Sequence, residues 1–153
     1  MRFTLTSSGF ADRGTIPTKF TCDGTNLSPA LAWQGAPNAT RSFVLIVDDP
    51  DAPTGPFTHW LLYDIPLAVR SLAEGQKPGW TGHSGVNDFD RRGYGGPCPP
   101  RGHGLHRYVF TVFAVDVDTL GLVEGASRIH VEARMRGHVV ATAKLMGKYE
   151  RRK

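Results

Sequence analysis

The stretch SFVLIVDDPDAPTGPFTHWLLYDIP, residues 42–66, decides the fold. Residues 43–47 are too uniformly apolar for a half-exposed strand, so we expect a central strand that is covered on both faces. Residues 60–65 form a second apolar run, which predicts a partner strand. Prolines at positions 50, 53 and 56 stiffen the connecting loop, because each fixes its own φ and holds the preceding residue extended.

A stiff loop can hold polar side chains in fixed relative positions, as a binding site requires. This loop contains Asp49 and Asp51 and leads through His59 into the second strand. Aspartate and proline are also ordinary turn formers, so a purely structural role for the loop stays open.

A second loop and strand repeat this arrangement. A loop rich in glycine and proline, residues 93–105, leads into a β-rich run at residues 108–117 that is apolar on both faces. His106 and Tyr108 lie at the junction. Shorter alternating runs predict strands at residues 2–6, 19–22 and 30–33, the last with Leu31 and Trp33 on one face.

The C-terminal part of the chain predicts one helix and one strand. Residues 127–136 contain helix formers and begin at a plausible N-cap, Ser127. Residues 139–149 alternate and suit a closing strand, with an alanine-rich helix as the alternative. The whole pattern predicts a mainly β, antiparallel fold with a short C-terminal helical segment and long loops.

Length and composition predict a single domain over residues 1–153, which is large enough to fold without a disulfide. The two cysteines, Cys22 and Cys98, lack metal-ligand spacing and are expected to be free thiols in a reducing cytoplasm. The N-terminus has no apolar signal-peptide core, and no run approaches the roughly 20 apolar residues of a membrane span. We therefore expect a cytoplasmic location without membrane insertion.

The net charge is +4, and basic residues gather near the C-terminus. Nucleic-acid binding is not expected, because the aromatic residues of a base-stacking surface are not interleaved with this charge. A basic nucleic-acid-binding module remains an alternative, which a steep salt dependence would reveal.

Five motifs carry a resemblance to a known family: SPALAW at 28–33, DDPDAP at 48–53, THWLLYDIP at 58–66, GGPCPP at 95–100 and GLHRYVFTVFAVD at 104–116. The chain resembles the phosphatidylethanolamine-binding protein (PEBP) family, and more closely its short bacterial branch of Raf kinase inhibitor-like proteins. This resemblance implies an antiparallel β-sandwich with a small cavity at one end. The cavity would bind phosphate or a phospholipid headgroup.

The resemblance also implies which residues form the site. The residues expected to bind the ligand are Asp49, Asp51, His59, Pro99, Pro100, His106 and Tyr108. The residues expected to form or support the wall are Phe57, Trp60, Gly96, Cys98 and Arg107. For Arg107, an ion pair with a loop carboxylate such as Asp51 is the favoured interpretation.

The predicted site contains a contradiction, because bare carboxylates repel an anion. We expect a carboxylate to accept one imidazole N–H and so favour the protonated ring, whose second N–H faces the anion. Anion binding should then strengthen as the pH falls from 8 to 6, because the ring becomes protonated. A neighbouring carboxylate should move this pH range upward.

The predicted function is a non-catalytic regulatory or inhibitor-type module that binds a small anion, with no cofactor, metal or catalytic residue. A kinase or protease partner and a homodimer that pairs near the cavity mouth are further expectations. One enzymatic alternative is a phosphoryl hydrolase that uses Asp49-x-Asp51, a chemistry that favours parallel strands alternating with helices. Another is a metal site formed by His103 and His106 with Asp49 or His59.

Overall fold

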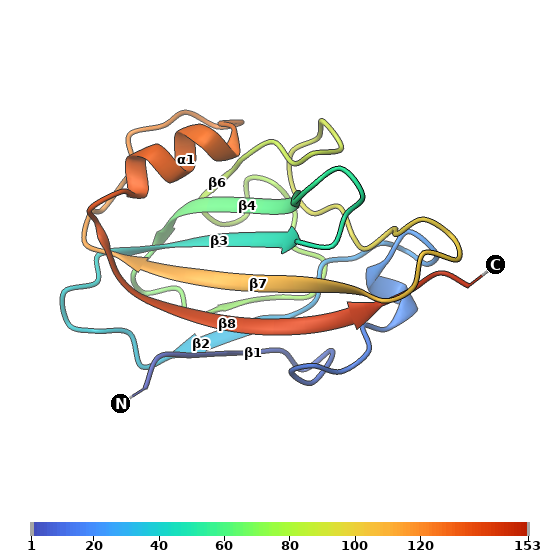
Figure 1. Cartoon of the computed structure of the whole chain (residues 1–153). Helices are drawn as coiled ribbons and strands as arrows, with labels where there is room; N and C mark the ends of the chain where they lie inside the picture. Colours follow the sequence, from blue (N-terminus) through green and yellow to red (C-terminus); the bar gives the residue numbers. More distant parts are fainter. Residues whose placement is uncertain (1, 153) are drawn as a thin grey trace.

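Two antiparallel sheets and one α-helix form the fold of the computed structural model, which describes residues 2–152 (Figure 1). The ends of the predicted domain, Met1 and Lys153, lie outside the described residues. The large sheet has the order β6-β4-β3-β7-β8: His83–Ser84, Phe57–Pro66, Ser42–Asp49, His106–Val115 and Val139–Tyr149. The small sheet has the order β1-β2-β5: Thr4–Thr6, Leu31–Gln34 and Ser71–Leu72. The helix α1 is Arg128–Met135, and a short 3₁₀ helix is Thr18–Phe20.

The predicted central strand is confirmed. β3 pairs antiparallel with β4 on one side and with β7 on the other. Its side chains alternate between two apolar layers, with Leu45 in the layer under the small sheet and Val44 in the layer under α1, both fully buried. The uniform apolar character of residues 43–47 thus follows from burial on both faces.

The small sheet covers one face of the large sheet (Figure 1). Leu31 and Trp33 share the buried face of β2, as the alternation predicts. The Trp33 ring packs edge-on against Phe43, with 5.5 Å between the ring centroids. Aromatic contact in this geometry fixes how the two sheets sit against each other.

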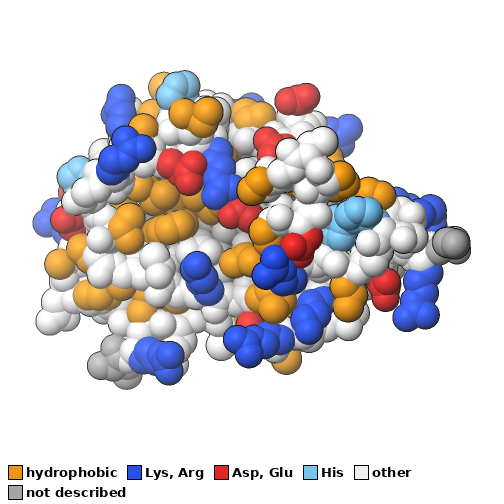
Figure 2. Space-filling view, viewed as in Figure 1, with side chains coloured by type: hydrophobic (Ala, Val, Ile, Leu, Met, Phe, Trp, Pro, Cys, Tyr) orange, Lys and Arg blue, Asp and Glu red, His pale blue; other side chains and the backbone are white. Residues whose placement is uncertain are grey.

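The helix α1 covers part of the opposite face, and its predicted position is confirmed. Val131 and Met135 are its buried residues. The helix covers β7 and β8 only in part. Phe113 packs against the helix-side core cluster but stays half-buried, and Val140 is exposed. Figure 2 shows the resulting apolar surface between α1 and these strands. The prediction that β7 is buried on both faces therefore holds fully only on the small-sheet side.

The C-terminal residues 139–149 form β8, a strand rather than the alternative helix. β8 pairs with β7 along its whole length. No helix within residues 2–152 is long and apolar enough to cross a membrane.

The strand predicted at residues 19–22 is wrong. Thr18–Phe20 is a 3₁₀ helix, followed by turns in which the Thr21 amide and hydroxyl both donate to the Thr18 carbonyl, at 2.9 and 2.8 Å. Local bonds of this kind compete with a strand ladder, and a four-residue alternation is too short to decide between them. Phe20 is nonetheless fully buried in the core.

The prediction of two free thiols is also wrong, because Cys22 and Cys98 form a disulfide across 76 residues of sequence. A backbone hydrogen bond from the Cys22 amide to the Pro97 carbonyl, at 3.1 Å, brings the two segments together beside the bond. Sequence spacing alone gave no signal for this pairing, since the two cysteines lie in separate loops.

Replacing both cysteines by serine, Cys22→Ser with Cys98→Ser, should lower the free energy of unfolding by about 3 to 4 kcal/mol. The cross-link closes a long loop and so restricts the unfolded chain. Denaturant titration of both proteins without reductant measures the difference. Reductant should destabilise the original chain and leave the double variant unchanged, and equal stabilities within 1 kcal/mol would contradict the expectation.

Candidate functional site

A cavity of about 250 Å³ lies where β3 ends, β4 begins and β7 begins. Its wall comes from the Asp-Pro loop, from the start of β4 and from the Gly/Pro loop before β7. The lining residues are Asp49, Ala52, Pro53, Thr54, Phe57, His59, Phe89, Cys98, Pro99, Pro100, His106 and Tyr108.

Strand geometry explains why the polar residues converge. Alternation places His106, Tyr108 and the core residue Phe110 on one face of β7. The register of β3 with β4 shifts between the pairs Val47–Trp60 and Asp48–Thr58, so His59 is the extra residue of a bulge. Such a bulge re-aims a side chain, and here it brings His59 beside Tyr108, with 5.2 Å between ring centroids.

A buried hydrogen bond joins Asp49 to His106. His106 Nδ1 lies 2.6 Å from Asp49 Oδ2, and the two residues are 1% and 3% exposed. The other oxygen of Asp49 accepts the Asp51 amide at 2.7 Å. Asp49 is therefore satisfied by the protein itself, and it fixes the tautomer of His106 by accepting the Nδ1 proton.

The second nitrogen of His106 faces His103, a residue that does not line the cavity. His103 Nδ1 lies 2.6 Å from His106 Nε2. Two ring nitrogens that are hydrogen-bonded to each other do not point at a common ion. Within residues 2–152, no group of three or more histidine, cysteine or acidic side chains is arranged to hold a metal ion.

His59 is held by a backbone carbonyl. Its Nδ1 lies 2.6 Å from the Gly95 oxygen, which only accepts, so Nδ1 carries the proton. Burial lowers the pKa of His59, although the bond to Gly95 and the charge of Asp49 oppose this shift. The predicted upward shift is therefore corrected to a downward one for this residue.

Tyr108 contributes a hydroxyl that has no protein partner. The residue is 1% exposed, and within residues 2–152 its oxygen makes no hydrogen bond. Burial raises the pKa of Tyr108. The Asp49 carboxylate lies near the hydroxyl but outside ordinary hydrogen-bond geometry, and its charge and accepting oxygen raise the pKa further. The hydroxyl thus stays protonated at physiological pH and is available as a donor to a bound group.

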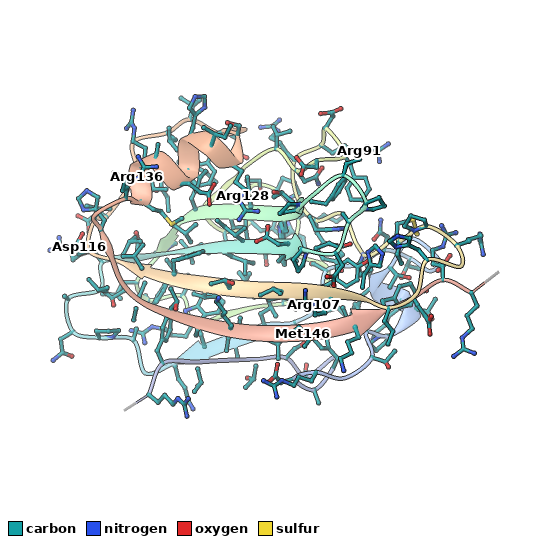
Figure 3. All side chains as sticks on the ribbon, viewed as in Figure 1. Arg91, Arg107, Asp116, Arg128, Arg136 and Met146 are labelled. Atoms are coloured by element: carbon teal, nitrogen blue, oxygen red, sulfur yellow. A yellow bond between two sulfur atoms is a disulfide. The ribbon has the colours of Figure 1, made fainter. Side chains whose placement is uncertain are left out.

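Asp51 and Arg107 form the predicted ion pair and lie outside the cavity wall. The guanidinium contacts both carboxylate oxygens at 2.8 and 2.9 Å, and the Arg107 amide donates at 2.9 Å. These bonds hold the pKa of Asp51 down to about 2. Figure 3 labels Arg107 near the start of β7, where this pair joins the Asp-Pro loop to the strand.

Two predicted wall residues lie elsewhere. Trp60 packs in the core against Tyr94, with 5.3 Å between ring centroids, because it follows the bulge and faces the small sheet. Gly96 donates its amide to the Asn26 side chain at 2.9 Å and lines a neighbouring cavity of about 330 Å³.

The remaining predicted residues, Phe57, Cys98, Pro99 and Pro100, line the cavity. No sequence pattern pointed to Phe89, which packs edge-on against Phe57, with 4.8 Å between the ring centroids, and belongs to an irregular, glycine-rich segment. It also lines the neighbouring cavity together with Cys98.

Sheet order and cavity together define a β-sandwich with a small pocket at one end of its core, in which apolar walls surround a few polar side chains. A family model described as phosphatidylethanolamine-binding protein matches residues 6–150. The UPF0098 protein of Aquifex aeolicus is 53% identical over 148 residues, which cover 95% of this chain and 86% of the relative. The chain therefore belongs to the phosphatidylethanolamine-binding protein family, as its motifs indicate.

Other relatives match nearly the whole of this chain. The crystal structure of CT736 from Chlamydia trachomatis, a candidate PEBP homolog, matches with a TM-score of 0.90 and 39% identity over 97% of each chain. The candidate lipoprotein LppC of Mycobacterium tuberculosis is 40% identical over 147 residues, 96% of this chain and 72% of the relative. The predicted antiparallel sandwich is thus confirmed by a solved structure as well as by the sheets themselves.

Asp51→Asn should lower stability by about 1 kcal/mol at pH 7, because the ion pair is partly exposed and screened. A carboxyl whose pKa is lower in the folded state stabilises the folded protein at pH values above its unfolded-state pKa, near 4. This contribution is lost as the pH falls toward the folded-state pKa of about 2. The difference from the original chain should shrink over that window. Denaturant titrations at pH 7, 4 and 2 measure it. Asp118→Asn, which breaks an exposed pair with Arg41, is the control, and a pH-independent difference would contradict this account.

Tyr108→Phe should leave the unliganded protein as stable as before, within about 0.5 kcal/mol, because the lost hydroxyl has no partner. Tyr63→Phe is the matched control. The Tyr63 hydroxyl bonds to the Val123 carbonyl and the Ala126 amide, so its loss should cost about 1 kcal/mol. Thermal unfolding of both variants compares them, and equal losses would show that the Tyr108 hydroxyl is satisfied in the folded protein.

Proposed function

We propose that this chain binds a phosphate-like anion in the cavity between Asp49, His59 and Tyr108, and that it does so without chemical conversion. The anion is inorganic phosphate or the phosphate of a lipid headgroup. The observation that carries the proposal is the buried, unpartnered hydroxyl of Tyr108, because a donor without a partner in a cavity costs free energy until a ligand accepts from it.

The proposed binding mode follows from the donors that remain. Arg107 is engaged by Asp51, so no guanidinium of that pair is left for the ligand. The Tyr108 hydroxyl donates to an anion oxygen, and a protonated His59 adds an N–H from Nε2. Neutral His59 instead accepts from a ligand hydroxyl or ammonium group through the same nitrogen. The proline and phenylalanine walls exclude water and strengthen these bonds.

A non-catalytic role is part of the proposal. The sulfur of Cys98, which lines the cavity, is bonded in the disulfide and is no free nucleophile. Asp49 is buried and already accepts two hydrogen bonds, which leaves it poorly placed to attack a phosphoryl group. Binding alone suits the regulatory or inhibitor-type role that the family resemblance implies, with a kinase or protease as the class of partner.

Two exposed apolar residues near the cavity support a protein contact there. Leu105 is 56% exposed beside His106, and Phe89 is 39% exposed at the wall. The same rim would serve a homodimer, which sedimentation at high micromolar concentration would detect. No part of the proposal involves nucleic acid, and binding to RNA or DNA that falls steeply with salt would contradict it.

The cytoplasmic location remains a prediction that cell fractionation can check. It rests in part on free thiols, and the disulfide between Cys22 and Cys98 removes that support. The relative LppC carries the name of a lipoprotein.

Phosphate titrated by calorimetry or NMR should bind at pH 6, and His59→Ala should weaken it about tenfold, since the Nε2 of neutral His59 accepts from a P–OH of dihydrogen phosphate and a hydrogen bond to a charged group contributes about 1.5 to 3 kcal/mol. Tyr108→Phe should weaken it similarly. The His59→Ala protein should still fold, because the residue sits at a bulge at the edge of the core.

His138→Ala is the control for this titration. His138 pairs with Asp116, which lies at the opposite end of β7 from Arg107 (Figure 3). This variant should bind as the original chain does. Affinity that is indifferent to both His59→Ala and Tyr108→Phe would place the anion site elsewhere.

A further inference from the structure

Three side chains form a continuous hydrogen-bonded row that runs from the core to the surface. Asp49 and His106 are buried, and His103 is exposed in the loop before β7. The two links have the same length, 2.6 Å from Asp49 Oδ2 to His106 Nδ1 and 2.6 Å from His106 Nε2 to His103 Nδ1. His106 lines the cavity, whereas the other ring sits behind it, with 4.8 Å between the ring centroids.

The positions of the protons follow from this geometry. An ionised Asp49 only accepts, so His106 Nδ1 is the donor of the inner link. In a neutral ring, His106 Nε2 is then an acceptor, and the proton of the outer link comes from His103 Nδ1. The one nitrogen of the row left with a free lone pair is His103 Nε2, on an exposed side chain. A further proton taken from solvent is therefore accepted at that nitrogen.

We propose that His103 is the residue that takes up a proton when a phosphate-like anion enters the cavity, and that the buried Asp49–His106 pair holds the protonated ring beside the site. The inference rests on the proposed function. It replaces the expectation that a second N–H of His106 faces the anion, because His103 occupies that nitrogen. His103 thus acts through its charge, outside the cavity wall.

The groups around the row favour this assignment. His106 is flanked by Tyr108 on its own strand and by the Asp51–Arg107 pair, in which the charges cancel. His59 is buried and donates to Gly95, and burial lowers its pKa, so it gains a proton only at more acidic pH. The loop that carries His103 lies against the C-terminal segment, where Gly102 and Gly104 share a surface depression with Glu150, Arg151 and Arg152. Within residues 2–152, Arg151 pairs with Asp23 and Arg152 with Glu150, so carboxylates balance the charges of these two arginines.

The size of the effect follows from the distance between charges. A unit charge about one ring away from an anion, in a partly hydrated setting, changes its affinity about five- to tenfold.

The test measures affinity at pH 8 and pH 6 by calorimetry with two probes, inorganic phosphate and glycerophosphoethanolamine. The phosphodiester probe keeps one negative charge across this range, so its pH dependence comes from the protein. The original chain should bind five- to tenfold more tightly at pH 6. The probe that binds more tightly identifies free phosphate or the lipid headgroup as the source of the ligand.

Two variants change the proposed residue in opposite ways. His103→Gln can still donate to His106 Nε2 but cannot ionise, so its affinity should stay at the pH 8 value at both pH values. His103→Arg also donates and is always charged, so its affinity at pH 8 should match that of the original chain at pH 6. Proton uptake on binding, measured in buffers with different ionisation enthalpies, should be lost in both variants.

His130→Gln is the matched control, because His130 is exposed on α1 and bonds only to Ser127. It should keep the original pH dependence. A His103→Gln protein that also keeps it would overturn the assignment, as would weaker binding by His103→Arg at pH 8. If the original chain binds equally at both pH values, the anion site stands and the role of His103 fails. If it binds neither probe at pH 6, the proposed function itself fails.

Discussion

The buried hydrogen bond between Asp49 and His106 is the constraint on which the arrangement of the site depends. A carboxylate that is 3% exposed is costly unless it is paired and hydrogen-bonded, so the end of β3 and the start of β7 must meet with these side chains aligned. Antiparallel pairing meets this requirement, because the end of one strand lies beside the start of the next. The bond therefore joins the two central strands at the edge of the core, and it sets the tautomer of a ring that lines the cavity.

Three other features position the rest of the cavity wall: an ion pair, a disulfide and a β-bulge. The Asp51–Arg107 pair fastens the Asp-Pro loop to β7, and the disulfide fastens the Gly/Pro loop to the N-terminal segment. The bulge in β4 turns His59 toward Tyr108. Each feature acts on one loop or strand end, while the pairing of β3 with β7 stays regular. This separation is typical of a rigid scaffold that presents a site on its connecting segments.

Patterns that depend on burial could be predicted from the sequence, and pairings between distant segments could not. Residues 43–47 indicated a central strand because continuous apolar character has a single common cause, burial on both faces. The ion pair of Arg107 followed from opposite charges at two junctions of the same architecture. The disulfide, the bulge at His59 and the contact of His103 with His106 depend instead on how loops meet in space. Trp60 was misplaced for the same reason, since a bulge breaks the simple alternation of side chains along β4.

The two neighbouring cavities share a partition made of Phe89 and Cys98. The two residues differ in how firmly they are held in place. The sulfur side is covalently anchored to the N-terminal segment, whereas the phenyl ring is held only by contacts such as those with Phe57 and His59 and is 39% exposed. Rotation of that ring about its side-chain bonds would connect the 250 Å³ and 330 Å³ spaces. The wall can therefore move on the Phe89 side but not on the Cys98 side. A ligand bulkier than a headgroup gains room in the direction of Phe89 only.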